Sequence, residues 1–193
     1  ETILEVNLGA MIANLNYYRS KLKPETKMVC MVKASAYGAG SYEIAKTLQE
    51  HHVDYLAVAV ADEGSDLRKA GITASVIIMN PEMTAFKTMF DYKLEPEVYS
   101  FHLLDALIKE AEKEGITNFP IHVKLDTGMH RLGVCSGGYA PADRTAEGTE
   151  CRDCPFRLLT FGRERFATIR QFYTPADRNV RESVHGIAGS FSA

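Results

Sequence analysis

Residues 28–40 read Met-Val-Cys-Met-Val-Lys-Ala-Ser-Ala-Tyr-Gly-Ala-Gly, and the predicted fold is organised around this stretch. The apolar run 28–32 is typical of a buried strand, and Lys33 stands at its end. A lysine is unusual in this position because its ammonium group is costly to desolvate, and burial lowers the pKa of such an amine. A neutral lysine amine forms Schiff bases with aldehydes. The stretch therefore predicts a buried strand and a candidate nucleophile, with a snorkelling surface lysine as the alternative.

Short apolar runs alternate with helical patterns along the first two thirds of the chain. We predict strands over residues 2–8, 28–32, 55–61, 76–79, 93–98 and 119–125. We predict helices that begin near Leu8, Ser41, Asp62, Asn80 and Ser100, with Ser41, Asn80 and Ser100 as N-caps. This alternation is typical of parallel βα units, which build either an open doubly wound sheet or a (β/α)8 barrel.

Composition excludes several classes of partner. The 193 residues are 46% hydrophobic and 24% charged, with a net charge of −3 that favours neither nucleic acid nor an anionic membrane. No apolar run is long enough to span a bilayer. Four cysteines do not form a disulfide framework, so a cytoplasmic location is expected. The isolated pair Cys151 and Cys154 does not predict a metal site. The chain begins at Glu1, which suggests that it was cut from a longer protein.

A second group of charged residues follows the last predicted strand. Alternation along residues 121–128 places Lys124 and Asp126 on one face of that strand. Arg131 follows in a turn, where a guanidinium suits a carboxylate or a phenolate oxygen. The alternative for Lys124 and Asp126 is an internal ion pair, and the alternative for Arg131 is a surface charge. In (β/α)8 barrels the catalytic residues stand at the carboxyl ends of several strands, and here cations stand at two separate strand ends. No G-x-G-x-x-G motif, which is typical of dinucleotide-binding doubly wound sheets, follows the first strands. We therefore favour the barrel.

These two segments resemble the motifs of alanine racemases: residues 32–40 are similar to the cofactor-binding motif, and residues 124–133 to a second signature. The similarity is nearest to the racemase half of Bacteroidetes-type fusions with a Mur ligase. It implies the N-terminal strands and helices of a (β/α)8 (TIM) barrel that binds pyridoxal 5'-phosphate (PLP) as a Schiff base on Lys33. Lys33 would also be one of two catalytic bases. Tyr37 would pack beside PLP, Arg131 would meet its phenolic oxygen and the substrate carboxylate, and Lys124 matches a lysine that is often carbamylated.

The resemblance implies interconversion of L- and D-alanine in the cytoplasm, which supplies D-alanine for peptidoglycan. Full-length family enzymes are expected to be homodimers in which the partner supplies the second base, a tyrosine, so we expect this chain to be inactive alone. The alternatives are a PLP-binding barrel without catalysis, a Schiff-base lyase or aldolase, and an inert fragment.

The resemblance stops near Gly133. We therefore predict two parts: residues 1–133, the PLP-binding barrel portion, and residues 134–193, an atypical tail rich in arginine. Reading the tail one base out of frame restores segments that resemble the family, which predicts a shifted reading frame; a divergent tail is the alternative.

Overall fold

A computed structural model describes residues 2–126, 131–135, 156–161 and 168–170. The helices are α1 (Leu8–Ser20), α2 (Lys33–Tyr37), α3 (Ser41–Glu50), α4 (Ala61–Lys69), α5 (Phe86–Asp91) and α6 (Phe101–Lys113), and the 3-10 helix η1 (Met83–Ala85) precedes α5. The strands are β1 (Val29–Met31), β2 (Tyr55–Val58), β3 (Ser75–Ile78), β4 (Leu94–Val98), β5 (Phe119–Asp126), β6 (Val134–Cys135), β7 (Phe156–Phe161) and β8 (Thr168–Arg170).

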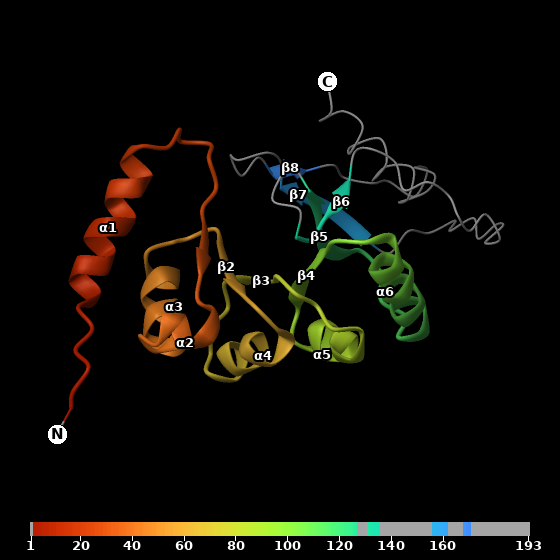
Figure 1. The fold of residues 1–193 in the computed structure, drawn as a ribbon, viewed down its shortest axis with the longest axis horizontal. Coiled ribbons are helices and arrows are strands. Elements are labelled where there is room, and N and C mark those ends of the chain that lie inside the picture. Colours follow the sequence, from red (N-terminus) through yellow and green to blue (C-terminus); the bar gives the residue numbers. More distant parts are fainter. Residues whose placement is uncertain (1, 127–130, 136–155, 162–167, 171–193) are drawn as a thin grey trace.

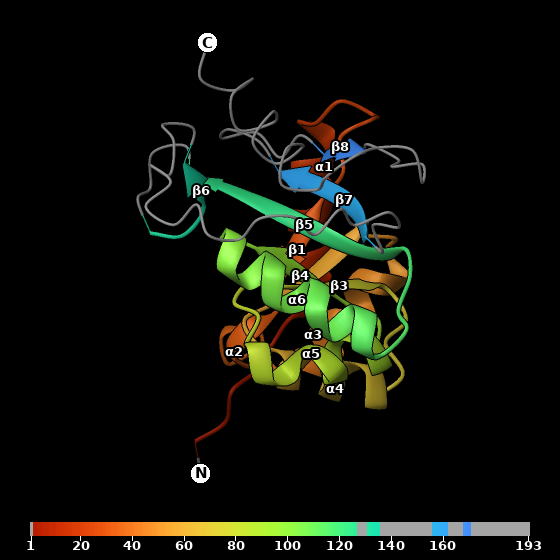
Figure 2. The same ribbon diagram turned by 90° about the vertical axis from the view of Figure 1, so that its right-hand side faces the viewer.

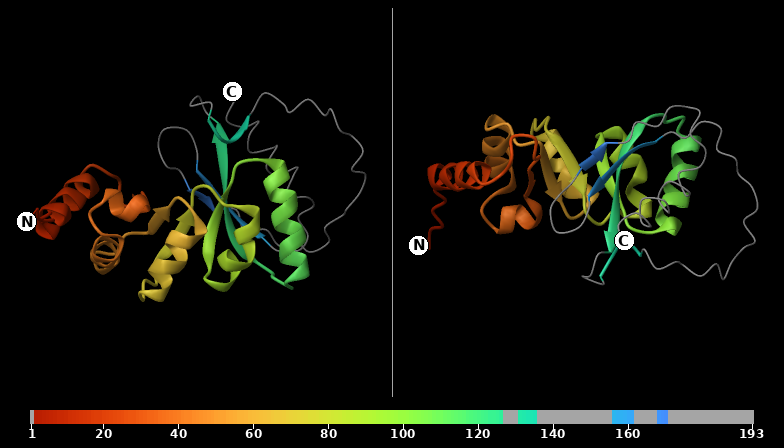
Figure 3. Two further views of the ribbon diagram at one scale, coloured as in Figure 1. Left: turned by 60° about the horizontal axis from the view of Figure 1, so that its bottom comes forward. Right: turned by 90° about the horizontal axis from the view of Figure 1, so that it is seen from above.

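Strands β1 to β5 lie side by side in the order in which they occur in the chain, and each is parallel to the next (Figure 1). Helices connect successive strands, and Figure 3 shows α3 to α6 following one another along one side of the curved sheet. Successive parallel βα units of this kind form part of a (β/α)8 barrel. The predicted barrel architecture is therefore confirmed, and the doubly wound sheet is not.

The two faces of the sheet differ in chemistry. The face toward the helices is apolar and holds Leu56, Val76 and Leu94, which belong to the main hydrophobic core. The opposite face, here called the inner face, is formed by alternating residues of the same strands. Its members are Val29, Met31, Tyr55, Ala57, Ile77, Glu95, Glu97, His122 and Lys124. The inner face therefore changes from apolar at β1–β3 to charged at β4 and β5. Strand β5 crosses the centre of Figure 2.

The predicted N-cap of α6 is confirmed, and a glycine follows the end of α4. Ser100 caps α6, because its hydroxyl oxygen accepts a hydrogen bond from the Leu103 N–H at 3.2 Å. Gly71 follows α4 with a φ of +94°, in the left-handed region that favours glycine. No helix in the described part of the chain is both long and apolar enough to cross a bilayer.

Three predictions of local structure are wrong. Residues 2–7 form no strand, and Ile3 is 75% exposed, because no described strand lies beside them to complete a ladder. Ser41 does not cap α3, since the cap position is Gly40 and no side chain bonds there. The α-helix expected after Asn80 begins only at Phe86: the Asn80 N–H still donates to the Ala59 carbonyl oxygen at 2.9 Å, and the 3-10 helix η1 comes first.

Beyond Gly133 the structure describes three short strands. β6 and β7 both pair in parallel with β5, and β8 is antiparallel to β7. Most of the predicted atypical tail, 134–193, including Cys151 and Cys154, lies outside the described residues. The division at Gly133 and the shifted reading frame remain predictions.

Candidate active site

Lys33 lies two residues beyond β1 and is half-buried. Val29 and Met31 point to the inner face, whereas Val32 belongs to the core between sheet and helices. Alternation therefore places Lys33 on the inner side, at the carboxyl ends of the parallel strands. This is the edge at which (β/α)8 barrels carry their chemical groups.

The chain turns sharply after Lys33 in an uncommon backbone conformation. Ala34, Ser35, Ala36 and Tyr37 have φ values of +51°, +54°, +51° and +57°, so the segment α2 is a left-handed turn. For residues other than glycine this conformation costs about 1–2 kcal/mol each. Backbone strain of this kind persists only where the surroundings fix it, and it concentrates at functional sites.

Glu63 supplies part of that fixation. Its carboxylate accepts the Ala34 N–H at 2.7 Å through one oxygen and the Ala59 N–H at 2.7 Å through the other. Glu63 stands in the first turn of α4, so one side chain connects the segments that follow β1 and β2. The bond to Ala34 holds the residue next to Lys33 and so fixes the start of the turn.

The inner face of β4 and β5 carries one ion pair, Lys124 with Glu97, and one buried histidine–carboxylate contact, His122 with Glu95. Glu97 lies opposite His122 in the register of the two strands. Lys124 Nζ donates to Glu97 Oε2 at 3.0 Å, and His122 Nε2 lies 2.7 Å from Glu95 Oε2. Glu95, Glu97 and His122 are all buried. Burial raises the pKa of Glu97, and the positive charges of Lys124 and Arg131 oppose that rise.

The structure brings the predicted site residues together in two groups. Lys33 and Tyr37 share the left-handed turn after β1, and Tyr37 is 70% exposed. Lys124 stands on β5, and Arg131 follows it in an exposed position from which its charge acts on Glu97. Because β1 to β5 are parallel, both groups lie at the carboxyl edge of one sheet.

Sequence reasoning missed three acidic residues: Glu63 and Glu97 near this edge, and Glu95 nearer the amino end of β4. Glu63 gives no local signal, because its two partners are backbone N–H groups on distant segments. Glu95 and Glu97 did carry a signal. They alternate within an otherwise apolar strand, and two buried carboxylates on one face require partners.

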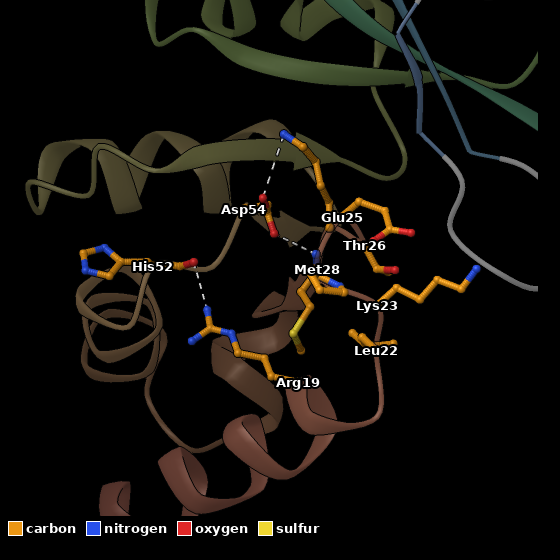
Figure 4. Close-up of a pocket in the computed structure, with 10 residues that line it drawn as sticks. Arg19, Leu22, Lys23, Glu25, Thr26, Met28, His52 and Asp54 are labelled. Carbon is orange, nitrogen blue, oxygen red and sulfur yellow. Dashed lines mark hydrogen bonds and ion pairs between the residues drawn. The ribbon is translucent and has the colours of Figure 1, made fainter.

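A separate pocket of about 620 Å³ lies at the other, amino-terminal end of the strands (Figure 4). The Arg19 guanidinium donates to the His52 carbonyl oxygen at 2.9 Å, and Asp54 accepts the Met28 N–H at 2.8 Å. These contacts join α1 and β1 to the segment before β2. The pocket is remote along β1 from Lys33, so we do not assign the candidate chemistry to it.

The amine, the exposed aromatic ring and the guanidinium at the carboxyl edge are a donor set that fits an anionic aromatic aldehyde. The amine can bond to the aldehyde carbon, the ring can pack on a planar ring, and the guanidinium can bind an oxygen anion. The strained turn beside the amine gives this set a defined place in the fold.

Comparison with known proteins gives one consistent family. The family model described as alanine racemase, N-terminal domain, matches residues 6–152. The alanine racemase of Thermodesulfovibrio yellowstonii is 35% identical over 133 residues, which are 67% of this chain and 36% of the relative. That of Methanococcus maripaludis is 38% identical over 131 residues, 67% of this chain and 35% of the relative.

Solved structures agree with the sequence comparison. The alanine racemase of Clostridium difficile 630 superposes with a TM-score of 0.66 at 34% identity, covering 72% of this chain and 37% of that one. Its complex with cycloserine gives a TM-score of 0.64 at 36% identity, covering 68% and 36%. The chain thus spans about a third of the length of its relatives. Since the family model covers most of the chain, this protein belongs to the alanine racemase N-terminal domain family.

Proposed function

We propose that this chain is the PLP-binding portion of an alanine racemase, in which Lys33 holds the cofactor. The observation that carries the proposal is the position of Lys33, at the carboxyl edge of the inner face and directly before the strained left-handed turn. Lys124 and Arg131 stand at the same edge. Family membership and the motif residues support the same assignment.

The side chains have separate tasks in this proposal. Lys33 would hold the aldehyde carbon of PLP through its ε-amine, Tyr37 would pack against the pyridine ring, and Arg131 would bind the phenolic oxygen. When bound, PLP supplies an electron sink that stabilises negative charge at the substrate Cα. Arg131 would also orient the substrate carboxylate, and Lys33 Nζ would take the proton from Cα on one face.

Racemisation also needs a proton donor on the opposite face of the substrate. We therefore propose that this chain binds PLP but does not racemise alanine by itself, and that the activity belongs to a longer, homodimeric protein. The product D-alanine would serve peptidoglycan synthesis in the cytoplasm. The second candidate is a PLP-binding barrel protein that takes no part in racemisation, either alone or within a longer protein, because the chain spans only about a third of the length of the racemases it matches.

One titration separates the possibilities. PLP is added to the full chain, absorbance of the lysine-bound cofactor is recorded, and borohydride reduction followed by peptide mass spectrometry locates the modified lysine. We expect a band in the wild type that is lost in Lys33→Ala. It should persist in Lys27→Ala, which removes a lysine near the opposite end of β1.

The second readout is the exchange of L- and D-alanine by the PLP-loaded chain. A band without exchange supports binding alone, and exchange that requires Lys33 shows that the chain is itself a racemase. Absence of the band, or its persistence in Lys33→Ala, would contradict the assignment of Lys33.

A further inference from the structure

Strands β1 and β2 stop pairing at the level of Lys33. Their register joins Met31 to Ala57, so a continued ladder would set Lys33 opposite Ala59. The Val32 N–H still donates to the Ala57 carbonyl oxygen, at 2.8 Å. Beyond this bond the backbone groups of the two strands take other partners, so the separation of the strands begins at the candidate lysine.

The next two bonds of the ladder are replaced. Bonds between parallel strands are evenly spaced, so the Ala34 N–H would next donate to the Ala59 carbonyl oxygen, and the Ala59 N–H to the Val32 carbonyl oxygen. Both oxygens instead accept other N–H groups. The Ala59 oxygen accepts the Asn80 N–H at 2.9 Å, and the Val32 oxygen accepts the Ala36 N–H at 3.1 Å. The N–H groups of Ala34 and Ala59 therefore need an acceptor outside the ladder.

The Glu63 carboxylate accepts both of these N–H groups. One oxygen takes the Ala34 N–H and the other takes the Ala59 N–H, each at 2.7 Å. An ionised carboxylate suits this position because it is an acceptor only and has two oxygens. Its charge also lies in the first turn of α4, where the helix dipole favours an anion. One side chain thus takes the place of two ladder bonds.

The end of the ladder fixes the backbone beside Lys33. Ala34 is exposed, so without Glu63 its N–H would bond to water in several backbone conformations. The left-handed conformation of Ala34, with a φ of +51°, would then be one conformation among several. A binding group that is correctly placed for only part of the time has an apparent affinity reduced by that fraction. The bond from Ala34 to Glu63 therefore favours ligand binding at Lys33.

We propose that Glu63 is a positioning residue for Lys33, which it places by ending the pairing of β1 with β2. Glu63 acts on Lys33 through the backbone of Ala34. Through its second oxygen it also joins Ala59, at the end of β2, to the cofactor site. The role toward PLP rests on the proposed function, whereas the two hydrogen bonds are formed without cofactor.

The first test is a PLP titration of the full chain, read from the absorbance band assigned to Lys33. Glu63→Gln presents one acceptor oxygen in place of two, so one N–H group loses its bond. We expect PLP binding to weaken about tenfold, because the turn then spends less time in the binding conformation.

Gln49→Ala is the matched control. The Gln49 side-chain oxygen accepts the N–H groups of Thr73 and Ala74 at 2.7 and 2.8 Å, so it also holds two backbone groups of a distant segment. That segment precedes β3, at the amino ends of the strands. Gln49→Ala should lower stability in urea but change PLP affinity less than about twofold. Unchanged affinity in Glu63→Gln, or an equal loss in Gln49→Ala, would refute the positioning role.

The second test needs only the wild type. If Glu63 connects Ala59 to the cofactor site, PLP binding must in turn stabilise the bond to Ala59, because coupling between two sites is reciprocal. We expect saturating PLP to slow amide exchange at Ala59 about tenfold, and at Thr73 and Ala74 much less. No slowing at Ala59, or equal slowing at all three amides, would contradict the connection.

The cofactor-free chain separates this proposal from the proposed function. A wild type that shows no PLP band would count against the proposed function. Amide exchange at Ala34 and Ala59 without PLP would then still decide the role of Glu63 in ending the ladder. Faster exchange in Glu63→Gln than in the wild type would support that role, and equal rates would overturn it.

Discussion

Replacing Glu63 by alanine should release the turn that carries Lys33. The carboxylate accepts two backbone N–H groups, each at 2.7 Å. A hydrogen bond to a charged group contributes about 1.5–3 kcal/mol, and the lower value suits a half-buried side chain. Two such bonds therefore give about 3 kcal/mol of local stability. Without them the four left-handed residues lose the contact that fixes Ala34.

The assay is amide hydrogen exchange at Ala34 and Ala59 under native conditions. A loss of about 3 kcal/mol in the free energy of local opening corresponds to exchange about a hundredfold faster. The matched control is Asp62→Ala, which removes the neighbouring charge from the same first turn of α4. It should cost at most about 1 kcal/mol through the helix dipole and speed exchange less than about tenfold.

The comparison has a clear negative outcome. If exchange at Ala34 and Ala59 in Glu63→Ala matches that in Asp62→Ala, then Glu63 acts only through the helix dipole. The left-handed turn would in that case be held by other contacts, and the connection between the segments after β1 and β2 would be refuted.

Three further predictions concern stability, each measured by urea unfolding. Gly64→Ala should lower the free energy of unfolding by about 1–3 kcal/mol, because the new Cβ would lie 2.9 Å from Leu94 Cδ1 in a packed core. An unchanged urea midpoint would show that the neighbouring side chains move to accommodate the methyl group. Arg68→Lys should cost about 2 kcal/mol, since the guanidinium donates to four backbone carbonyl groups and an ammonium cannot reach them all; equal stability would contradict this. Burial raises the pKa of Glu97. The folded state therefore holds the carboxyl proton of Glu97 to higher pH than the unfolded state does, so the wild type should lose stability relative to Glu97→Gln as pH rises above about 4.5. A gain in stability over this pH range would contradict the prediction.

The order of elements could be predicted from the sequence because burial on both faces gives parallel strands continuous apolar runs. Residues 55–58 illustrate this, since all four are buried and the strand was expected there. Helix ends were predictable at Ser100, where the cap bonds locally, and not at Asn80, whose N–H bonds to the Ala59 carbonyl oxygen on a distant segment. The first strand was wrongly predicted because alternation alone does not provide a neighbouring strand.

The candidate site was predictable only in part. Lys33, Lys124 and Arg131 stand at strand ends, which a periodic pattern can locate. The left-handed turn was not foreseen, because Ala34–Tyr37 contains no glycine to indicate positive φ. Glu97 pairs with a residue 27 positions away, and the register between β4 and β5 that permits this contact is a tertiary property.

The sequential strand order also bears on how the protein is made. Val29 pairs with Tyr55, Tyr55 with Ser75, and Val76 with Leu94, so each new strand needs only the one synthesised just before it. Ribosomes add about 5–20 residues per second, so a further strand emerges every few seconds. Contacts between near neighbours in sequence form rapidly by comparison. The sheet can therefore grow co-translationally, one βα unit at a time, with the nascent end always offering the free edge to which the next strand adds.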